Sequence, residues 1–137
     1  MNFLKHAFLI IAAVLSLNAY AREPVPIINY DNIPVATASG KPLAVEQVKQ
    51  AILVAAATKN WSVEPQADDH LLAMFSKQGK HTISVAISYT TDKYSLNYSD
   101  STNMKFGERE GQLVIHPFYN KWVQNLKEAI RIELLKI

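Results

Sequence analysis

The chain has 137 residues and no cysteine, and its 14 Lys and Arg against 12 Asp and Glu give a formal net charge of +2 with neutral histidines. A balance so near neutrality gives no electrostatic case for binding nucleic acid or an acidic membrane surface, because both require a concentrated positive charge. The missing cysteine excludes disulfides and a thiol nucleophile, so stability must come from an apolar core and from hydrogen bonds.

The first 21 residues show the parts of a secretory signal peptide in the expected order. A positive start at Lys5 precedes an uncharged apolar run over residues 7–17, and Ala19 and Ala21 are the small residues that a signal peptidase requires. The run is too short to span a bilayer, which takes roughly twenty apolar residues. We therefore expect cleavage after Ala21, a periplasmic location and a single domain over residues 22–137, without membrane insertion after cleavage. An uncleaved membrane anchor is the alternative.

The expected domain opens with a short strand, a loop and an amphipathic helix. Residues 27–35 (IINYDNIPV) contain β-branched residues, and Pro34 predicts an edge strand because proline cannot donate to a sheet ladder. Residues 37–42 (TASGKP) are typical of a loop. Over residues 43–59, apolar side chains recur at three- and four-residue spacing, which predicts a helix that stops at Asn60.

From residue 61 onward the apolar period changes to two, which predicts strands. The expected strands cover residues 61–64, 70–77, 81–89 and 94–99, and Gln78-Gly79 is the tight turn of a hairpin. Residues 99–111 form the longest polar loop, and residues 113–115 a brief extended piece. A second amphipathic helix is expected over residues 117–135, with Pro117 in its first turn.

This β-α-β-β-β-β-α order predicts an α+β fold. Strands joined by short turns make an antiparallel meander, here of about four to five strands, and the two amphipathic helices must pack on one face of it. The other face carries small and polar side chains at Ser84, Ala86, Ser88, Ser95 and Asn97, and is expected to meet solvent.

The sequence contains no catalytic constellation with the required spacing. It lacks the G-x-S-x-G, P-loop and G-x-G-x-x-G motifs. The histidines after the signal, His70, His81 and His116, fall on separate predicted elements, and no pair has the i, i+4 spacing of two helical metal ligands. We therefore expect no metal and no cofactor. The carboxylate pair Asp68-Asp69 is expected to be a solvated turn.

Residues 94–126 mix hydrogen-bonding and aromatic side chains where a strand ends and a helix begins. The free N–H groups of a helix start can hold an anion or a carboxyl group, so the segment predicts a small polar pocket. In the structural alternative, Asp100 and Ser101 bond the loop backbone and His116 caps the helix. The candidate ligand-binding residues are Asn97, Ser99, Asp100, Ser101, Asn103, His116, Tyr119 and Asn120.

Five stretches of the chain also carry a resemblance to known sequences. They are residues 40–48 (GKPLAVEQV), 51–61, 81–87 (HTISVAI), 94–104 (YSLNYSDSTNM) and 115–126 (IHPFYNKWVQNL). With these, the chain resembles a family of small uncharacterised bacterial envelope proteins, exported or lipid-anchored, of unknown function. The resemblance implies a compartment and a domain type, and transfers no activity and no catalytic residue. Lipid-anchored relatives would carry a cysteine at the cleavage point, where this chain has Arg22.

Three functions are compatible with these patterns. The lack of a catalytic set favours a non-enzymatic binding or interaction module, whose partner would be an envelope protein or a cell-wall ligand, reached for example by strand addition at residues 27–35. A small periplasmic hydrolase, with His116 as general base and Asp100 to orient it, is the enzymatic alternative. A structural subunit that forms a homodimer through the open sheet face is the third.

Overall fold

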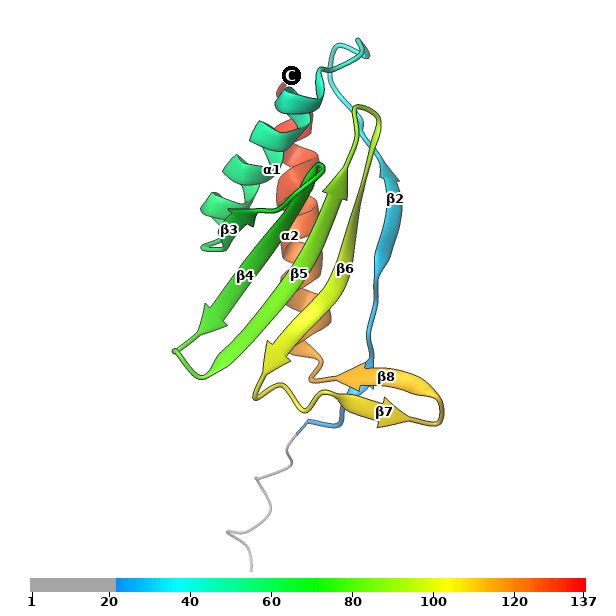
Figure 1. Cartoon of the computed structure of the whole chain (residues 1–137), viewed down its shortest axis with the longest axis vertical. Helices are drawn as coiled ribbons and strands as arrows, with labels where there is room; N and C mark the ends of the chain where they lie inside the picture. The colour runs from blue at the N-terminus through cyan, green and yellow to red at the C-terminus, as the bar shows by residue number, and fades with distance from the viewer. Residues whose placement is uncertain (1–21) are drawn as a thin grey trace, which may run out of the picture.

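The computed structural model describes residues 22–137, and the predicted signal peptide lies outside the described residues. A five-stranded antiparallel sheet has both helices on one face, and a small three-stranded sheet closes one end (Figure 1). The fold is α+β, as predicted. Its elements are β1 (Val25–Pro26), β2 (Tyr30–Pro34), α1 (Val45–Thr58), β3 (Ser62–Pro65), β4 (His70–Lys77), β5 (His81–Tyr89), β6 (Lys93–Thr102), β7 (Gly107–Arg109), β8 (Gln112–Ile115) and α2 (Phe118–Leu134).

The large sheet has the strand order β2-β6-β5-β4-β3, so the predicted meander occupies its centre. The strictly alternating pattern of β5 decides which face is covered, because successive side chains of a strand point to opposite faces. Ile83, Val85 and Ile87 are fully buried under the helices, whereas Ser84 and Ala86 are only half-buried on the open face.

The apolar stripes of the two helices cover that buried face. Val48 and Ile52 of α1 and Leu126 and Ile130 of α2 have no exposed surface and join the strand residues in one core. At the start of α1, the side-chain oxygen of Gln47 accepts the N–H of Ala44 at 2.9 Å, which satisfies a donor that a helix start leaves free. None of the helices within residues 22–137 is long and apolar enough to cross a membrane.

The N-terminal strand expected over residues 27–35 is divided between the two sheets. β1 pairs with β8 in the small sheet, and β2 pairs with β6 as an edge strand, as Pro34 predicted. Asn32 has a φ of 54°, and the register shifts between Tyr30 and Ile33. This irregularity breaks the row of free N–H and C=O groups that an added strand would need.

The polar loop expected over residues 99–111 was predicted wrongly. β6 continues to Thr102, which pairs with Thr82 of β5, and β7 pairs with β8. Ser99 is the extra residue of a bulge, because Ser84 lies opposite Asp100 while Val85 lies opposite Tyr98. Serine and aspartate favour turns, but a partner strand that offers a continuous ladder overrides that local preference.

Candidate functional site

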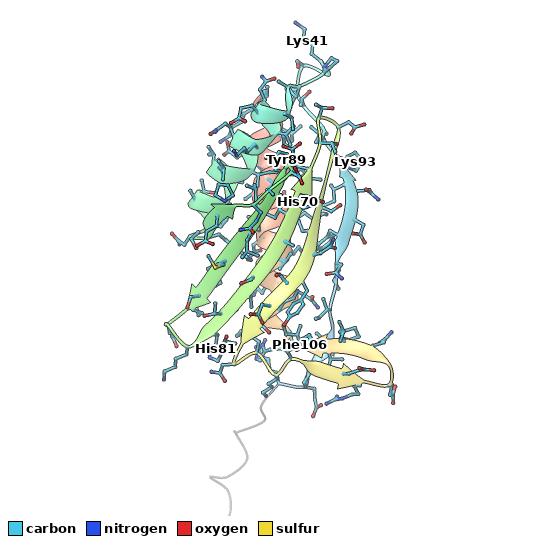
Figure 2. All side chains as sticks on the ribbon, in the orientation of Figure 1. Lys41, His70, His81, Tyr89, Lys93 and Phe106 are labelled. Atoms are coloured by element: carbon cyan, nitrogen blue, oxygen red, sulfur yellow. The ribbon has the colours of Figure 1, made fainter. Side chains whose placement is uncertain are left out.

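Three chain segments meet at the end of the sheet where α2 begins, and they enclose a cavity of about 350 Å³. These are the β4–β5 turn, the link between β6 and β7, and the β8–α2 junction. Figure 2 labels His81 at this end of the molecule, opposite Lys41. We call the cavity the histidine pocket. Its lining residues are Lys77, Gln78, His81, Met104, His116, Phe118, Lys121 and Trp122.

His81 reaches the pocket because β5 begins directly after the tight hairpin turn. Gln78 and Gly79 have φ angles of 55° and 66°, which turn the chain sharply within the three residues that separate Lys77 from its partner His81. The Nδ1 atom of His81 lies 2.8 Å from the carbonyl oxygen of Asn103. Since a carbonyl only accepts, this nitrogen carries the proton, and Nε2 of the neutral ring keeps its lone pair.

His116 has the opposite tautomer. Its Nδ1 atom accepts the N–H of Phe118 at 3.0 Å, at the start of α2, so the proton of the neutral ring is on Nε2. Burial lowers the pKa of His116, and the positive charges of Lys105 and Arg22, with that of His81 when its ring is protonated, lower it further. The site therefore favours a neutral His116 that can donate one hydrogen bond from Nε2.

Two consecutive backbone carbonyls hold the histidines side by side. The oxygen of Asn103 faces His81, and the oxygen of Met104 accepts the N–H of His116 at 2.8 Å. Asn103 has a φ of 59°, in the left-handed region that asparagine tolerates, and so ends β6. The main chain, rather than a carboxylate, thus orients both rings.

The rest of the pocket combines positive charge with an aromatic wall. Lys77 and Lys121 line it together with the histidines, and among the described residues no Asp or Glu does. Phe118 and Trp122 have ring centroids 5.7 Å apart, and Trp122 also lies 5.0 Å from Phe75 of β4. The guanidinium of Arg22 lies 4.6 Å from the centre of the Phe118 ring. These contacts hold the wall in place.

Of the eight candidate residues, only His116 contributes its side chain to this pocket. Asn97 lies opposite Ala86 in the large sheet, away from the pocket, and Ser99 is exposed in the bulge. Asp100 accepts the N–H of Ser101, whose hydroxyl lies 2.8 Å from the hydroxyl of Tyr98. Asp100 thus bonds the backbone, as the structural alternative expected, whereas Ser101 bonds a side chain, and none of these four residues lines the pocket.

Tyr119 and Asn120 also have structural positions. Tyr119 is fully buried, with its ring 5.5 Å from that of Tyr98, and burial raises the pKa of its phenol. The side chain of Asn120 accepts the N–H of Ile28 and donates to the carbonyl of Pro26, both at 3.0 Å. It fastens the N-terminal segment to α2.

The predicted acid–base pair of His116 and Asp100 is not hydrogen-bonded. Nδ1 of His116 is occupied by the N–H of Phe118, and Oδ1 of Asp100 accepts from its neighbour Ser101. Likewise, His70 and His81 lie at different levels of the same hairpin, opposite Ser88 and Lys77. Within residues 22–137 no three His, Cys, Asp or Glu side chains gather as metal ligands.

Sequence reasoning missed Lys77, His81 and Lys121 as pocket residues. One feature of the sequence could have indicated them, because all three lie at the end of a strand or helix. Lys77 ends β4, His81 begins β5, and Lys121 lies in the first turn of α2. This hairpin turn and this helix start meet at one edge of the sheet because of the strand order. The tertiary structure sets that order, and local sequence patterns do not reveal it.

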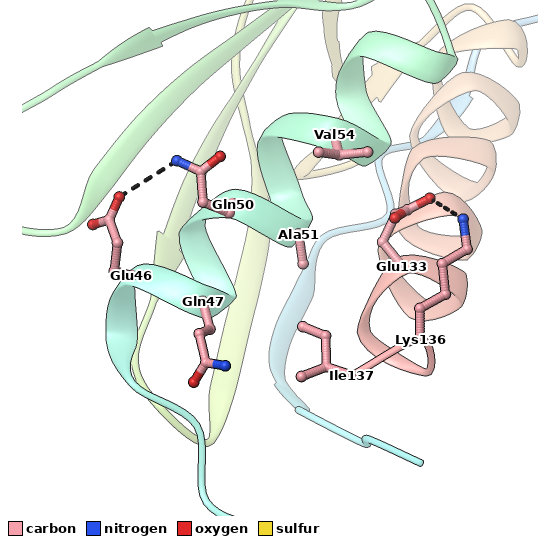
Figure 3. Close-up of a pocket in the computed structure, with 8 residues that line it drawn as sticks. All are labelled: Glu46, Gln47, Gln50, Ala51, Val54, Glu133, Lys136 and Ile137. Carbon is pink, nitrogen blue, oxygen red and sulfur yellow. Dashed lines mark hydrogen bonds and ion pairs between the residues drawn. The ribbon is translucent and has the colours of Figure 1, made fainter. Parts of the chain in front are cut away.

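A second depression, the helix groove, lies between α1 and the far end of α2 (Figure 3). It also has a volume of about 350 Å³. Its polar side chains bond one another, Lys136 to Glu133 at 2.7 Å and Gln50 to Glu46 at 3.4 Å. The lining residues are Glu46, Gln47, Gln50, Ala51, Val54, Glu133, Lys136 and Ile137.

Comparisons of the chain with protein-family models, with curated proteins and with solved structures find no match. The resemblance to bacterial envelope proteins therefore stays a prediction from the sequence. The function is therefore inferred from the histidine pocket.

Proposed function

We propose that this protein is an exported, non-enzymatic binding module of the bacterial envelope, and that the histidine pocket holds its ligand or the contacting group of its partner. The signal-like first 21 residues and the resemblance to envelope proteins support the compartment. The histidine pocket supports the binding role, because preformed concave sites with a few convergent polar groups are where proteins hold small ligands.

The observation that carries this proposal is the way the two histidines are fixed. Each ring uses Nδ1 for a main-chain hydrogen bond, so each has only Nε2 left for another partner. Catalytic histidines are commonly oriented by a carboxylate, and here a main-chain group holds Nδ1 of each ring instead. Fixed nitrogens beside a rigid aromatic wall favour recognition over proton transfer.

Photocrosslinking in intact cells tests the proposal. A photoreactive amino acid replaces Lys121 at the rim of the pocket, and a matched control replaces Lys41 at the opposite end of the molecule (Figure 2). We expect a discrete adduct from position 121 in the envelope fraction, which mass spectrometry then identifies, and none from position 41. Equal labelling at both positions, or none at position 121, would contradict the proposal.

A further inference from the structure

We propose that the histidine pocket binds an organic anion, a carboxylate or phosphate group on a flat apolar body, and that His81 takes up a proton when the anion binds. This inference rests on the proposed function, since it specifies the ligand of the same pocket. It follows from the charge of the lining, from the two tautomers and from the aromatic wall.

The charged side chains that line the pocket are all positive. The charged and titratable groups around the two rings come from β4, α2, the β6–β7 link and the N-terminal segment. They are Lys77, Lys121, Lys105 and Arg22. The carboxylate of the nearby Glu23 does not offset them, because it pairs with Arg109 at 3.2 Å. An anion in the pocket would relieve repulsion among these cations.

The tautomers determine how such an anion is bound. The neutral His116 donates from Nε2, whereas the neutral His81 presents a lone pair there, which repels an anion. When His81 gains a proton on Nε2, both rings donate, and Lys77 and Lys121 add two ammonium groups. Anion binding and protonation of His81 therefore favour each other, which is a reciprocal linkage.

The apolar part of the lining favours a flat organic body over a bare inorganic ion. Met104 is nearly fully buried, while Phe118 and Trp122 are partly exposed at the pocket. An aromatic or unsaturated ring can stack there while its charged group meets the nitrogens. A small fully hydrated anion would leave this wall in water.

Titration calorimetry and amide NMR test the inference on protein purified after expression of the full chain. The ligands are benzoate, phenyl phosphate and, as a neutral ring of similar size, benzyl alcohol. We expect both anions to bind and shift pocket resonances, and the alcohol to bind at least about tenfold more weakly. The ratio of benzoate to phenyl phosphate affinity identifies the preferred anion. Benzyl alcohol binding as tightly as benzoate would overturn the inference.

The pH dependence tests the role of His81. Benzoate stays ionised between about pH 7.5 and about pH 5.5. As the pH falls through this range, its affinity should rise by up to about tenfold per pH unit for as long as His81 of the free protein is neutral. In His81→Asn, the side-chain amide keeps the hydrogen bond to Asn103 but loses Nε2, so this rise should disappear. In His116→Asn, the affinity should fall while the rise persists. An unchanged pH profile in His81→Asn would overturn the proton linkage.

The charge contribution is tested by Lys121→Gln, with Lys136→Gln in the helix groove as the matched control. We expect about a tenfold weaker binding of benzoate in the former and no change in the latter. A crosslink at position 121 without any anion binding would refute the anion while leaving the binding module intact. Anion binding without a crosslink would refute the proposed partner and support the ligand class.

Discussion

The histidine pocket and the helix groove have equal volumes and lie at opposite ends of α2, yet their polar groups do different things. In the groove, Glu133 and Lys136 are paired with each other and Gln50 with Glu46 (Figure 3). In the pocket, Nε2 of each histidine is left over from the main-chain hydrogen bonds, and both histidines line the cavity together with Lys77 and Lys121. Volume alone therefore does not mark a binding site, whereas side-chain donors and acceptors without a partner inside the protein do.

The groove is a by-product of helix packing. Its lining includes Ala51 of α1, whose neighbour Ile52 is fully buried in the core. The pocket instead depends on three segments distant in the sequence, held together by the carbonyls of Asn103 and Met104. Changes at the groove should therefore affect stability, and changes at the pocket should affect binding.

The largest effect is expected beneath the groove, in the helix core. Ile52→Ala removes a fully buried side chain and should lower the free energy of unfolding by about 2–5 kcal/mol, through lost burial and a residual cavity. Val54→Ala, at a position 45% exposed on the same helix, should cost less than about 1 kcal/mol. Urea unfolding followed by circular dichroism measures both. Equal costs would show that α1 does not form part of the core.

A smaller effect is expected at Asn120, which distinguishes a structural residue near the pocket from a binding one. Asn120→Ala removes two hydrogen bonds to the N-terminal segment and should cost roughly 1–2 kcal/mol. The amide of Ile28 should exchange faster with solvent, while benzoate binding stays the same. The control is Asn125→Ala, at an exposed position on α2. A loss of ligand binding in Asn120→Ala would place this residue in the site after all.

The next effect concerns the pH dependence of stability. The pKa of His116 in the folded protein lies below its ordinary value of 6.5. At pH values between the folded-state pKa and 6.5, this residue therefore binds more protons in the unfolded chain than in the folded one. The contribution of His116 to stability is present above about pH 6.5 and is lost as the pH falls toward the lowered folded-state pKa.

The matched variant for this effect is His116→Asn, whose side-chain oxygen can still accept the N–H of Phe118. It should lose less unfolding free energy than the wild type between about pH 7.5 and about pH 5, as urea unfolding at both values would show. A saturating anion should also weaken the acid sensitivity of the wild type, because it binds the folded protein best when His81 is protonated. Parallel losses in variant and wild type would remove His116 as the cause.

The smallest effect is expected for the ion pair of the groove. Lys136→Gln breaks a contact in which the lysine side chain is 64% exposed, so unfolding should become easier by only about 0.3 kcal/mol. High salt should remove even that difference, since exposed charges are screened. Denaturation midpoints of wild type and variant at low and high salt measure it. A cost above about 1 kcal/mol would mean that the groove holds a coupled charge network.

Local patterns in the sequence determined most of the secondary structure. The strands expected over residues 70–77 and 81–89 have those bounds in the structure, and both helices agree within two residues at each end. The edge position of β2 followed from Pro34. These features depend on neighbours within a few residues, where side-chain period and proline chemistry act directly.

The tertiary structure alone decided where β6 ends and which residues share a cavity. Ser99 to Thr102 read as a loop, but the ladder offered by β5 makes them strand, because backbone pairing outweighs their weak turn preference. The candidate segment contained His116, yet its pocket partners Lys77 and His81 come from a hairpin about 35–40 residues earlier in the printed sequence. Contacts at such separation are set by strand order and register, which no local period encodes.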